Sequence, residues 1–391
     1  MKPWRRREVR LMRICFDGRV IRPGMTGVGV YAARLLPELL RQGAAHEWIV
    51  LHLPGAPMDE AREAARNAGA ALRLVETAAD YERHPGGEWW LNVTLPQLLG
   101  CERADVFHGP AHLIPWVRTR ARKVVTIHDL VCYRAPETLP RKFAWYMRRM
   151  IAWSARAADA VIAVSESTAR DLIAATGVAR GRIHIVYEAP GNGLKPPSPA
   201  QVESVRRRYG LAGAYLLHVG TLEPRKGVRT MVRVLEGLRA AGKDVDLALA
   251  GRVGWRSEGL LGELSASPAR DRIRRLDYVP SEDLPALYGG AVALLYLSHY
   301  EGFGLPPLEA MACGCPVVAS NRASLPEVVG EAGTLVEPGD VSGAIGAVVA
   351  LMADAPEGMG SARARAVERG LAQARRFSWG LAARQTLEAY Q

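Results

Sequence analysis

The chain has 391 residues, which is long enough for two domains at the usual size of roughly 150 residues each. Hydrophobic residues make up 49% and charged residues 23% of the sequence, a balance that fits a folded globular protein and excludes a disordered or fibrous one. The formal net charge of +11 predicts anionic partners, such as nucleotide diphosphates or an acidic lipid surface, although no stretch resembles a nucleic-acid-binding module.

The beginning of the chain, MKPWRRREVRLMR, is basic, and no apolar segment follows that would make a signal peptide. No run reaches the roughly 20 apolar residues that a membrane-spanning helix needs. The five cysteines are scattered, which favours a reduced, cytoplasmic setting. We therefore expect a cytoplasmic protein, with peripheral attachment to the inner face of the membrane left open. Residues 1–11 are predicted to be a disordered basic extension, and Met12 is a candidate start of translation.

The first half of the chain alternates short apolar runs with amphipathic segments, the pattern of a parallel sheet covered by helices. Strands are predicted over residues 13–17, 48–53, 71–76, 105–107, 123–127, 160–164 and 183–187. Helices are predicted over residues 30–42, 59–69 and 141–156, and from a cap at Ser165 or Ser167 to residue 176. Ligands of such sheets lie beyond the carboxyl ends of the strands, so residues that follow a strand are candidates for a site.

The loop after the first strand has the pattern G-x-G-x-x-A, which begins at Gly27 and Gly29. Glycines of this kind can cradle a phosphate at the start of a helix, or they can form an ordinary tight turn. A nicotinamide-dependent oxidoreductase would also need an acidic residue at the carboxyl end of the next strand. Glu47 instead precedes that strand, so the pattern is weak support for a dinucleotide enzyme.

Two histidines follow predicted strands and are candidates for contact with a ligand. His128 is the first candidate and His108 the second, and each could instead hold its own loop by hydrogen bonds. Trp89 and Trp90 could line an acceptor groove or pack in the core or an interface.

The helix predicted over residues 141–156 combines basic and aromatic side chains. Its residues near one face are Arg141, Trp145, Arg148, Arg149 and Arg156. Such a face suits an anionic membrane or a lipid-diphosphate acceptor, and the alternative is a solvated basic face over packed aromatics.

The stretch from Glu188 to Pro199 contains four prolines and two glycines, which is typical of a linker. We predict a first domain over residues 1–190 and a second over residues 198–375. In the second domain, strands are predicted over residues 215–219, 246–250, 291–297 and 315–319, and helices over 228–241, 281–288 and 308–312.

A loop in the second domain carries two adjacent cations, Arg225 and Lys226, between a strand and a helix. An arginine that binds two oxygens at once and a lysine that acts as a point charge together make a clamp for a diphosphate. Asp244 and Asp246 superficially match the D-x-D of metal-dependent transferases. They precede their strand, so we interpret them as part of a turn.

The most informative stretch runs from Ser298 to Leu325 and is predicted to form a glycine loop, a helix and a strand. The backbone N–H groups of Phe303, Gly304 and Leu305 lie at the expected start of the helix, where unpaired donors and the helix dipole favour an anion. Glu301 and Glu309 flank this position and are suited to accept hydrogen bonds from hydroxyls. The stretch therefore indicates a ligand that is part phosphate and part polyol.

Two motifs carry a resemblance to a known family. The sequence EGFGLPPLE, followed by AMACGCPVVAS and SLPEVVGEAGTLVEPGD, resembles the retaining, nucleotide-sugar-dependent glycosyltransferases of family 4 over residues 298–340. HVGTLEPRKG, at residues 218–227, resembles a second motif of the same family. The resemblance implies an α/β protein with the GT-B fold, in which two Rossmann-like domains face each other and a last helix, within residues 376–391, crosses back to the first domain.

The resemblance also implies roles for individual residues. The loop with Gly27 and Gly29 would face the donor's diphosphate and the acceptor, and His128 would lie near the donor sugar. Many members have an arginine where this chain has Thr221, so Arg225 would take that cationic role.

The nucleotide base would lie near the backbone of Tyr278 and Val279. Glu309 would hold the ribose and Glu301 the sugar hydroxyls.

We therefore expect a retaining glycosyltransferase that moves a hexose from a nucleotide-diphosphate sugar, with mannose from a guanosine donor as the best guess. The acceptor would be a saccharide or a lipid-linked saccharide of a surface polysaccharide, and neither a metal nor another cofactor is expected. Three alternatives remain: a related enzyme that acts on a nucleotide sugar without transfer, such as an epimerase or phosphorylase; a nicotinamide oxidoreductase; and a non-catalytic nucleotide-sugar-binding subunit.

Overall fold

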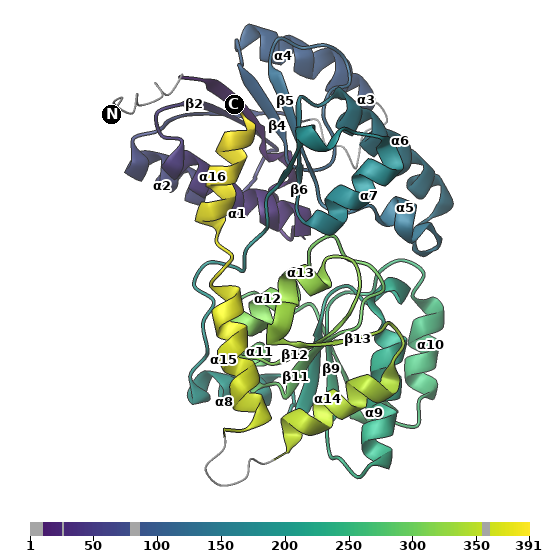
Figure 1. Cartoon of the computed structure of the whole chain (residues 1–391). Coiled ribbons are helices and arrows are strands. Elements are labelled where there is room, and N and C mark those ends of the chain that lie inside the picture. Colours follow the sequence, from purple (N-terminus) through teal and green to yellow (C-terminus); the bar gives the residue numbers. More distant parts are fainter. Residues whose placement is uncertain (1–10, 26, 79–86, 354–359) are drawn as a thin grey trace, which may run out of the picture.

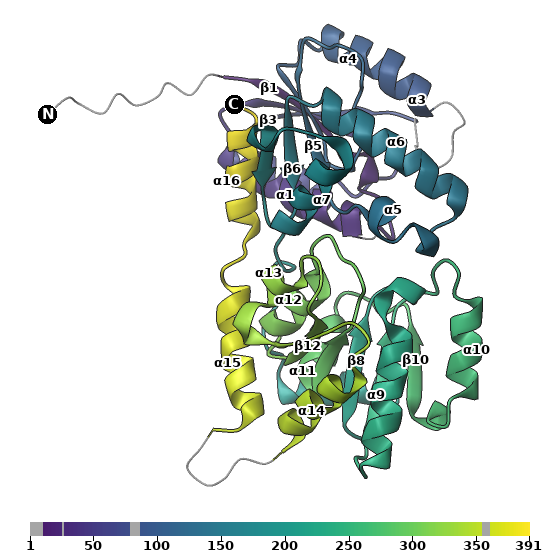
Figure 2. The same cartoon turned by 45° about the vertical axis from the view of Figure 1, so that its right-hand side comes forward.

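The computed structural model describes residues 11–25, 27–78, 87–353 and 360–391 of the chain (Figure 1). The N-terminal extension predicted over residues 1–11 lies outside these residues, except for Leu11. The chain forms two α/β units, one above the other in Figures 1 and 2, and each is built on its own parallel sheet. No helix among the described residues is both long enough and apolar enough to cross a membrane.

The first unit has a seven-stranded parallel sheet in the order β3-β2-β1-β4-β5-β6-β7. Its strands are β1 (Arg13–Asp17), β2 (Glu47–His52), β3 (Ala71–Glu76), β4 (Val106–Gly109), β5 (Arg122–Ile127), β6 (Ala160–Ala163) and β7 (Ile183–Ile185). The central strands are buried on both faces, and Phe16, Trp48 and Phe107 are among their largest buried side chains. Continuous burial explains why these strands appear in the sequence as apolar runs without alternation.

The second unit has a six-stranded parallel sheet in the order β10-β9-β8-β11-β12-β13. Its strands are β8 (Tyr215–Val219), β9 (Asp246–Ala250), β10 (Ile273–Asp277), β11 (Ala293–Tyr296), β12 (Val317–Ser320) and β13 (Thr334–Val336). In both sheets the order reverses beside the first strand, β1 or β8, which opens a crevice beyond the carboxyl ends of the strands. The two crevices are the expected positions for ligands.

Helices cover both faces of each sheet (Figures 1 and 2). Those of the first unit are α1 (Gly27–Gln42), α2 (Asp59–Ala68), α3 (Gly87–Trp89), α4 (Leu95–Cys101), α5 (Val131–Arg134), α6 (Arg141–Ala157) and α7 (Glu166–Thr176). Those that follow are α8 (Pro199–Arg208), α9 (Val228–Ala240), α10 (Glu258–Ala266), α11 (Leu284–Gly290), α12 (Leu305–Ala312), α13 (Leu325–Val329), α14 (Val341–Met352), α15 (Ala362–Ala374) and α16 (Trp379–Ala389).

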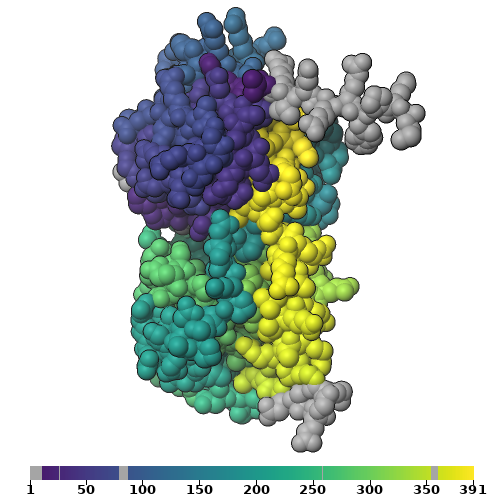
Figure 3. Space-filling view, turned by 90° about the vertical axis from the view of Figure 1, so that its left-hand side faces the viewer, coloured from purple at the N-terminus to yellow at the C-terminus, as the bar shows by residue number. Residues whose placement is uncertain are grey.

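The chain crosses between the two units twice. The first crossing is the proline-rich stretch before α8, and the second joins α15 on the second unit to α16 on the first, so that the C-terminal segment runs along both units in Figure 3. Helix α16 packs against α1. The hydroxyl of Tyr390 lies 2.7 Å from Nδ1 of His108, and Nε1 of Trp379 donates to the carbonyl oxygen of Pro190 at 3.0 Å. The C-terminal helix is therefore an integral part of the first unit.

Several predicted helix boundaries are wrong. The helix expected from residue 30 begins at Gly27, the one expected from residue 308 begins at Leu305, and the one expected over 281–288 is α11. For the first two of these helices, the sequence analysis left glycine and proline outside the first turn. The first N–H groups of a helix have no partner within it, so residues that lack an N–H or a side chain are tolerated there.

The segment around the two adjacent tryptophans is helical, with a π-helical turn over Trp90–Thr94 between α3 and α4. Trp89 is 70% exposed, whereas the Trp90 ring lies beneath the guanidinium of Arg19, 3.6 Å from its carbon. Neither ring lines the cavity between the units. For Trp90 the packing alternative is therefore the better description.

Candidate functional site

The loop before α12 joins the second unit to the first. The carbonyl oxygen of Gly302 accepts hydrogen bonds from Ser165 at 2.7 Å and from Thr168 at 3.1 Å, both from the first unit. A Cβ atom on Gly302 would lie 1.7 Å from the carbonyl oxygen of His128. Only glycine allows this approach, so the sequence EGFG brings Glu301 directly to the boundary between the units.

Two further contacts close the same boundary. The carboxylate of Glu327, in α13, accepts the backbone N–H groups of Glu166 and Ser167 at 2.8 and 2.7 Å, at the start of α7 in the first unit. The Tyr300 hydroxyl donates to Asp171 at 2.8 Å and accepts the N–H of Leu130 at 3.2 Å. A carboxylate at a helix N-terminus is favoured by unpaired donors and by the helix dipole. Both contacts fix the position of the loop around Glu301 relative to the first unit.

Glu301 lies between the two predicted cations. Its Oε1 is 2.7 Å from Nζ of Lys226, and its Oε2 is 3.1 Å from the Arg225 guanidinium. Arg225 also contacts Glu223 at 2.6 Å and donates to the carbonyl oxygen of Tyr300 at 2.5 Å. The sequence analysis anticipated that these cations and Glu301 share one site, but it missed Glu223, which lies in the same loop.

Burial and pairing act in opposite directions on these charges. Burial alone would raise the pKa of Glu301, but Lys226 and Arg225 outweigh it and lower the pKa to about 2. Burial lowers the pKa of Lys226, and the neighbouring Arg225 adds to this effect while Glu301 opposes it. Burial likewise works against the charge of Arg225, but Glu301 and Glu223 raise its pKa overall. One carboxylate between two cations is thus firmly ionised.

The predicted anion site lies at the start of α12. Gly304 precedes the helix with φ of 113°, a conformation that favours glycine, and no hydrogen bond from the N–H groups of Phe303, Gly304 or Leu305 is found among the described residues. Glu309 is half-buried, and its Oε2 accepts the hydroxyl of Tyr288 at 3.1 Å. Burial raises the pKa of Glu309, and the Tyr288 hydrogen bond opposes this. The N–H groups thus lie at the start of the helix, and their binding of an anion stays a prediction.

His128 does not present a free nitrogen in this arrangement. Its Nδ1 is 3.0 Å from the Glu188 carboxylate, and its Nε2 is 2.7 Å from the carbonyl oxygen of Pro110. Both ring nitrogens are therefore occupied by contacts within the protein. His108 is also fully engaged, with Tyr390 and Thr126. For both histidines the structure favours the alternative of holding a loop.

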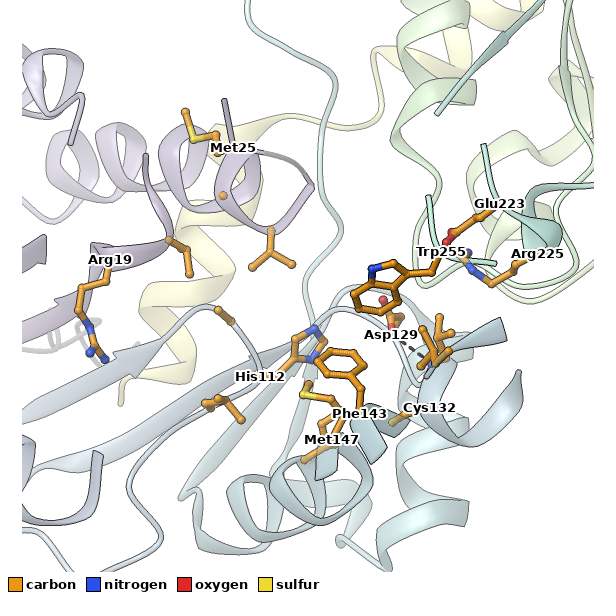
Figure 4. Close-up of a pocket in the computed structure, with 18 of the residues that line it drawn as sticks. Arg19, Met25, His112, Asp129, Cys132, Phe143, Met147, Glu223, Arg225 and Trp255 are labelled. Atoms are coloured by element: carbon orange, nitrogen blue, oxygen red, sulfur yellow. Dashed lines mark hydrogen bonds and ion pairs between the residues drawn. The ribbon is translucent and has the colours of Figure 1, made fainter. Parts of the chain in front are cut away.

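A cavity of about 430 Å³ lies between the two units (Figure 4). Its wall in the first unit is largely apolar and includes Phe143, Met147 and Ile151 along α6 and Leu139 just before it. The polar groups on this wall are Arg19, Arg22, His112 and Asp129. Glu223, Arg225 and Trp255 line it from the second unit. The rings of Phe143 and Trp255 meet across the boundary with their centres 5.0 Å apart. A cavity of this kind suits a ligand with apolar faces and a few hydrogen-bonding groups.

Other predicted site residues lie outside this cavity or serve packing. Gly29 lines it, but a Cβ there would be 2.6 Å from the carbonyl oxygen of Val20, so this glycine allows α1 to approach its preceding loop. Gly27 is the first residue of α1 and has open space around it. Tyr278 is 57% exposed beside Arg252, whereas Val279 is buried in the core. Both residues directly follow β10, a strand that the sequence analysis did not predict.

Asp246 lies in a strand and not in the predicted turn, and its role is structural. It is the first residue of β9, it is buried, and it forms ion pairs with Arg272 and Arg274 at 3.0 Å each. Asp244 also pairs with Arg272. Within the described ranges, no group of three or more histidine, cysteine or acidic residues is arranged to hold a metal ion.

Comparisons with known proteins agree with this architecture. The family model of glycosyl transferases group 1 matches residues 206–371, and that of glycosyltransferase family 4 matches residues 25–189. The chain is 34% identical to O-antigen chain mannosyltransferase B of Escherichia coli, over 97% of this chain and 100% of the relative. It is 32% identical to the MMP alpha-(1->4)-mannosyltransferase of Mycolicibacterium hassiacum, over 61% of this chain and 55% of the relative.

A solved structure shows the same fold. The crystal structure of Anabaena Alr3699/HepE in complex with UDP and glucose superposes with a TM-score of 0.72 at 20% identity, covering 96% of this chain and 98% of that chain. Two facing units of this kind, each built on a parallel sheet, define a GT-B protein, and the predicted fold class is confirmed. The chain belongs to the group 1 glycosyl transferases, and its first half is of the family 4 type. The protein is therefore a glycosyltransferase, and we set the nicotinamide alternative aside.

Proposed function

We propose that the protein is a mannosyltransferase that transfers mannose from GDP-mannose, with retention of anomeric configuration, to a saccharide acceptor of a surface polysaccharide. The observation that carries this proposal is the 34% identity, over the full length of the relative, to an O-antigen chain mannosyltransferase. A second relative is also named a mannosyltransferase. The cations at Arg225 and Lys226 and the start of α12 supply the positive charge that a nucleotide-diphosphate donor requires.

The charges at the boundary explain how the diphosphate could leave without a metal or another cofactor. As the bond between the sugar and the phosphate breaks, negative charge grows on the diphosphate, and Arg225, Lys226 and the N–H groups before α12 stabilise it. The acceptor oxygen forms its bond to the sugar on the same face, and its proton passes to the leaving phosphate oxygen. In this proposal the diphosphate replaces Glu301 beside Lys226, and the released carboxylate accepts hydrogen bonds from the sugar hydroxyls.

The test of this function is a transfer assay with the purified protein and a panel of nucleotide sugars that includes GDP-mannose and UDP-glucose. We expect mannose from GDP-mannose to become glycosidically bound, and the anomeric configuration of the product, measured by NMR, to match that of the donor. Transfer from a uridine donor alone would replace the proposed donor, and inversion would refute the proposed mechanism. Release of only free or epimerised sugar would favour the alternative without transfer.

We also propose that the protein works on the cytoplasmic side of a membrane, with α6 against an anionic lipid surface. One third of the circumference of this helix carries the residues Arg141, Lys142, Trp145, Arg149, Ala152, Trp153 and Arg156. This set has four cations and no acidic residue, and Trp145 and Trp153 are 60% and 41% exposed. Cations attract anionic head groups, and tryptophan rings favour the interface between lipid and water.

Charge reversal on this helix tests the membrane contact. We expect Arg149→Glu to weaken sedimentation with phosphatidylglycerol vesicles by roughly 30-fold, because a change of two charges near the surface is worth about 2 kcal/mol. The matched control is Arg369→Glu, an exposed cation on α15 of the second unit, which should change binding little. Equal losses in both variants, or no binding by the wild type, would contradict this surface.

A further inference from the structure

His112 lies in the cavity between the units, and neither motif includes it. It lines the same wall as Leu113 and Asp129, close to Phe143 and Met147 in Figure 4. Its Nδ1 is buried and forms no hydrogen bond within the part of the chain that the structure describes. A buried ring nitrogen without a partner is unusual in a protein, and it calls for an explanation.

The backbone at His112 is held in an uncommon conformation. Its φ is 65°, in the left-handed region that few residues other than glycine adopt, although histidine does so more often than most. The N–H of His112 donates to the carbonyl oxygen of Thr126 at 3.0 Å. Three residues earlier, at the end of β4, a Cβ on Gly109 would lie 2.4 Å from the carbonyl oxygen of Leu113. Such strain persists where the surroundings impose it, typically at functional sites. The loop therefore fixes the direction of the imidazole.

The imidazole of His112 is neutral at physiological pH. Burial lowers its pKa to about 4; the nearby Asp129 carboxylate opposes this shift, and His128 adds to it. The His112 and His128 rings meet edge to face, with their centres 5.3 Å apart. A neutral imidazole offers one donor and one acceptor. Because both nitrogens of His128 are engaged, His112 is the better placed of the two to bind a ligand in the cavity.

The surroundings of His112 match the acceptor side of the cleft. The cationic pair lies on the second unit, whereas His112 lies on the first, above the apolar row along α6. Phe143, Met147 and Ile151 recur every four residues along α6, so that one helix face forms this part of the wall, and Leu139 extends it just before the helix. A sugar ring can rest its C–H face on such a wall while the few polar side chains beside it, His112 among them, orient its hydroxyl groups.

We propose that His112 is an acceptor-binding residue, whose imidazole forms the hydrogen bond that places an acceptor sugar hydroxyl over the apolar wall of α6. This inference rests on the proposed transfer to a saccharide. It assigns His112 to the acceptor alone, so changes there should leave the handling of the donor intact.

Glycine at this position removes the imidazole and at the same time relieves the backbone, so His112→Gly should remain folded. We expect its KM for the acceptor to rise roughly tenfold, the usual cost of a buried hydrogen bond left unmade. The KM for the donor should stay within about twofold of the wild type, and so should the slow hydrolysis of the donor in the absence of acceptor. Neither quantity depends on a hydrogen bond between the protein and the acceptor sugar. His112→Asn, which tolerates positive φ and keeps a polar group, should recover part of the loss.

The matched control is Arg103→Gly. Arg103 is another non-glycine residue with positive φ, so glycine removes the same backbone strain, but it lies in an exposed turn away from the cavity. It should leave both KM values unchanged. An unchanged acceptor KM in His112→Gly, or a parallel loss of donor hydrolysis, would overturn the assignment while the proposed function stands. A wild type that transfers from no nucleotide sugar would refute the proposed function and this inference with it.

Discussion

Lys226→Ala is expected to lower the turnover number by roughly 100- to 1000-fold, the effect of removing one preorganised donor from a site that stabilises developing negative charge. Nζ of Lys226 lies 2.7 Å from Glu301 in a largely buried position, where a charge interacts more strongly than in water. The interaction grows as the diphosphate leaves, so turnover should fall more than the KM for the donor rises.

Steady-state kinetics of transfer at saturating donor, together with the melting temperature, measure this effect. Arg229→Ala is the matched control because Arg229 is an exposed cation nearby on α9, paired only with the exposed Glu263 at 2.6 Å among the described residues. That variant should keep near wild-type turnover. A Lys226→Ala enzyme that is folded and turns over within a few-fold of the wild type would contradict the role in charge stabilisation.

Glu301→Gln is expected to lower the free energy of unfolding by about 3–5 kcal/mol, because it leaves two buried cations without their shared carboxylate. The side chains of Glu301, Lys226 and Arg225 are only 10%, 11% and 12% exposed, so water cannot replace the lost partner. Transfer should fall as well, since in our proposal this carboxylate binds the sugar hydroxyls. Denaturant unfolding measures the first effect and the transfer assay the second.

The stability that Glu301 supplies should depend on pH in a defined direction. Its pKa in the folded protein is about 2, below the ordinary value of 4.5, so the folded state binds a proton less readily than the unfolded state. The contribution is fully present above the ordinary value and is lost as the pH falls toward 2. The difference between the wild type and Glu301→Gln should therefore shrink below about pH 4.5.

Glu263→Gln provides the control for this prediction, because its carboxylate forms an exposed pair with Arg229 that should contribute no more than about 1 kcal/mol. Equal stability of Glu301→Gln and the wild type at neutral pH would show that the two cations do not need this carboxylate.

Contacts that are local in the chain were predictable from the sequence. The apolar runs predicted the sheets because strands buried on both faces admit few polar residues, and β3 and β9 have the predicted bounds. The motif with Glu301 and Gly304 predicted a glycine loop followed by a helix because these elements follow one another directly in the chain, although the helix begins three residues earlier than expected. An anion at its start stays a prediction. Arg225 and Glu223 are two residues apart, and the sequence analysis could have paired them.

Contacts between distant parts of the chain were decided only by the tertiary structure. Whether His128 faces a ligand depends on Glu188 and on Pro110, which approach it from other loops. The closure of the units depends on Glu327 meeting the start of α7, across 160 residues of sequence. His112 has no motif at all, because its backbone conformation and its free ring follow from how its loop packs. The sequence by itself thus determined the fold, the class of enzyme and the charged residues that we propose for the donor site. The orientations of the side chains in the cleft were decided only when the two units packed against each other, because their contacts join residues far apart in the sequence.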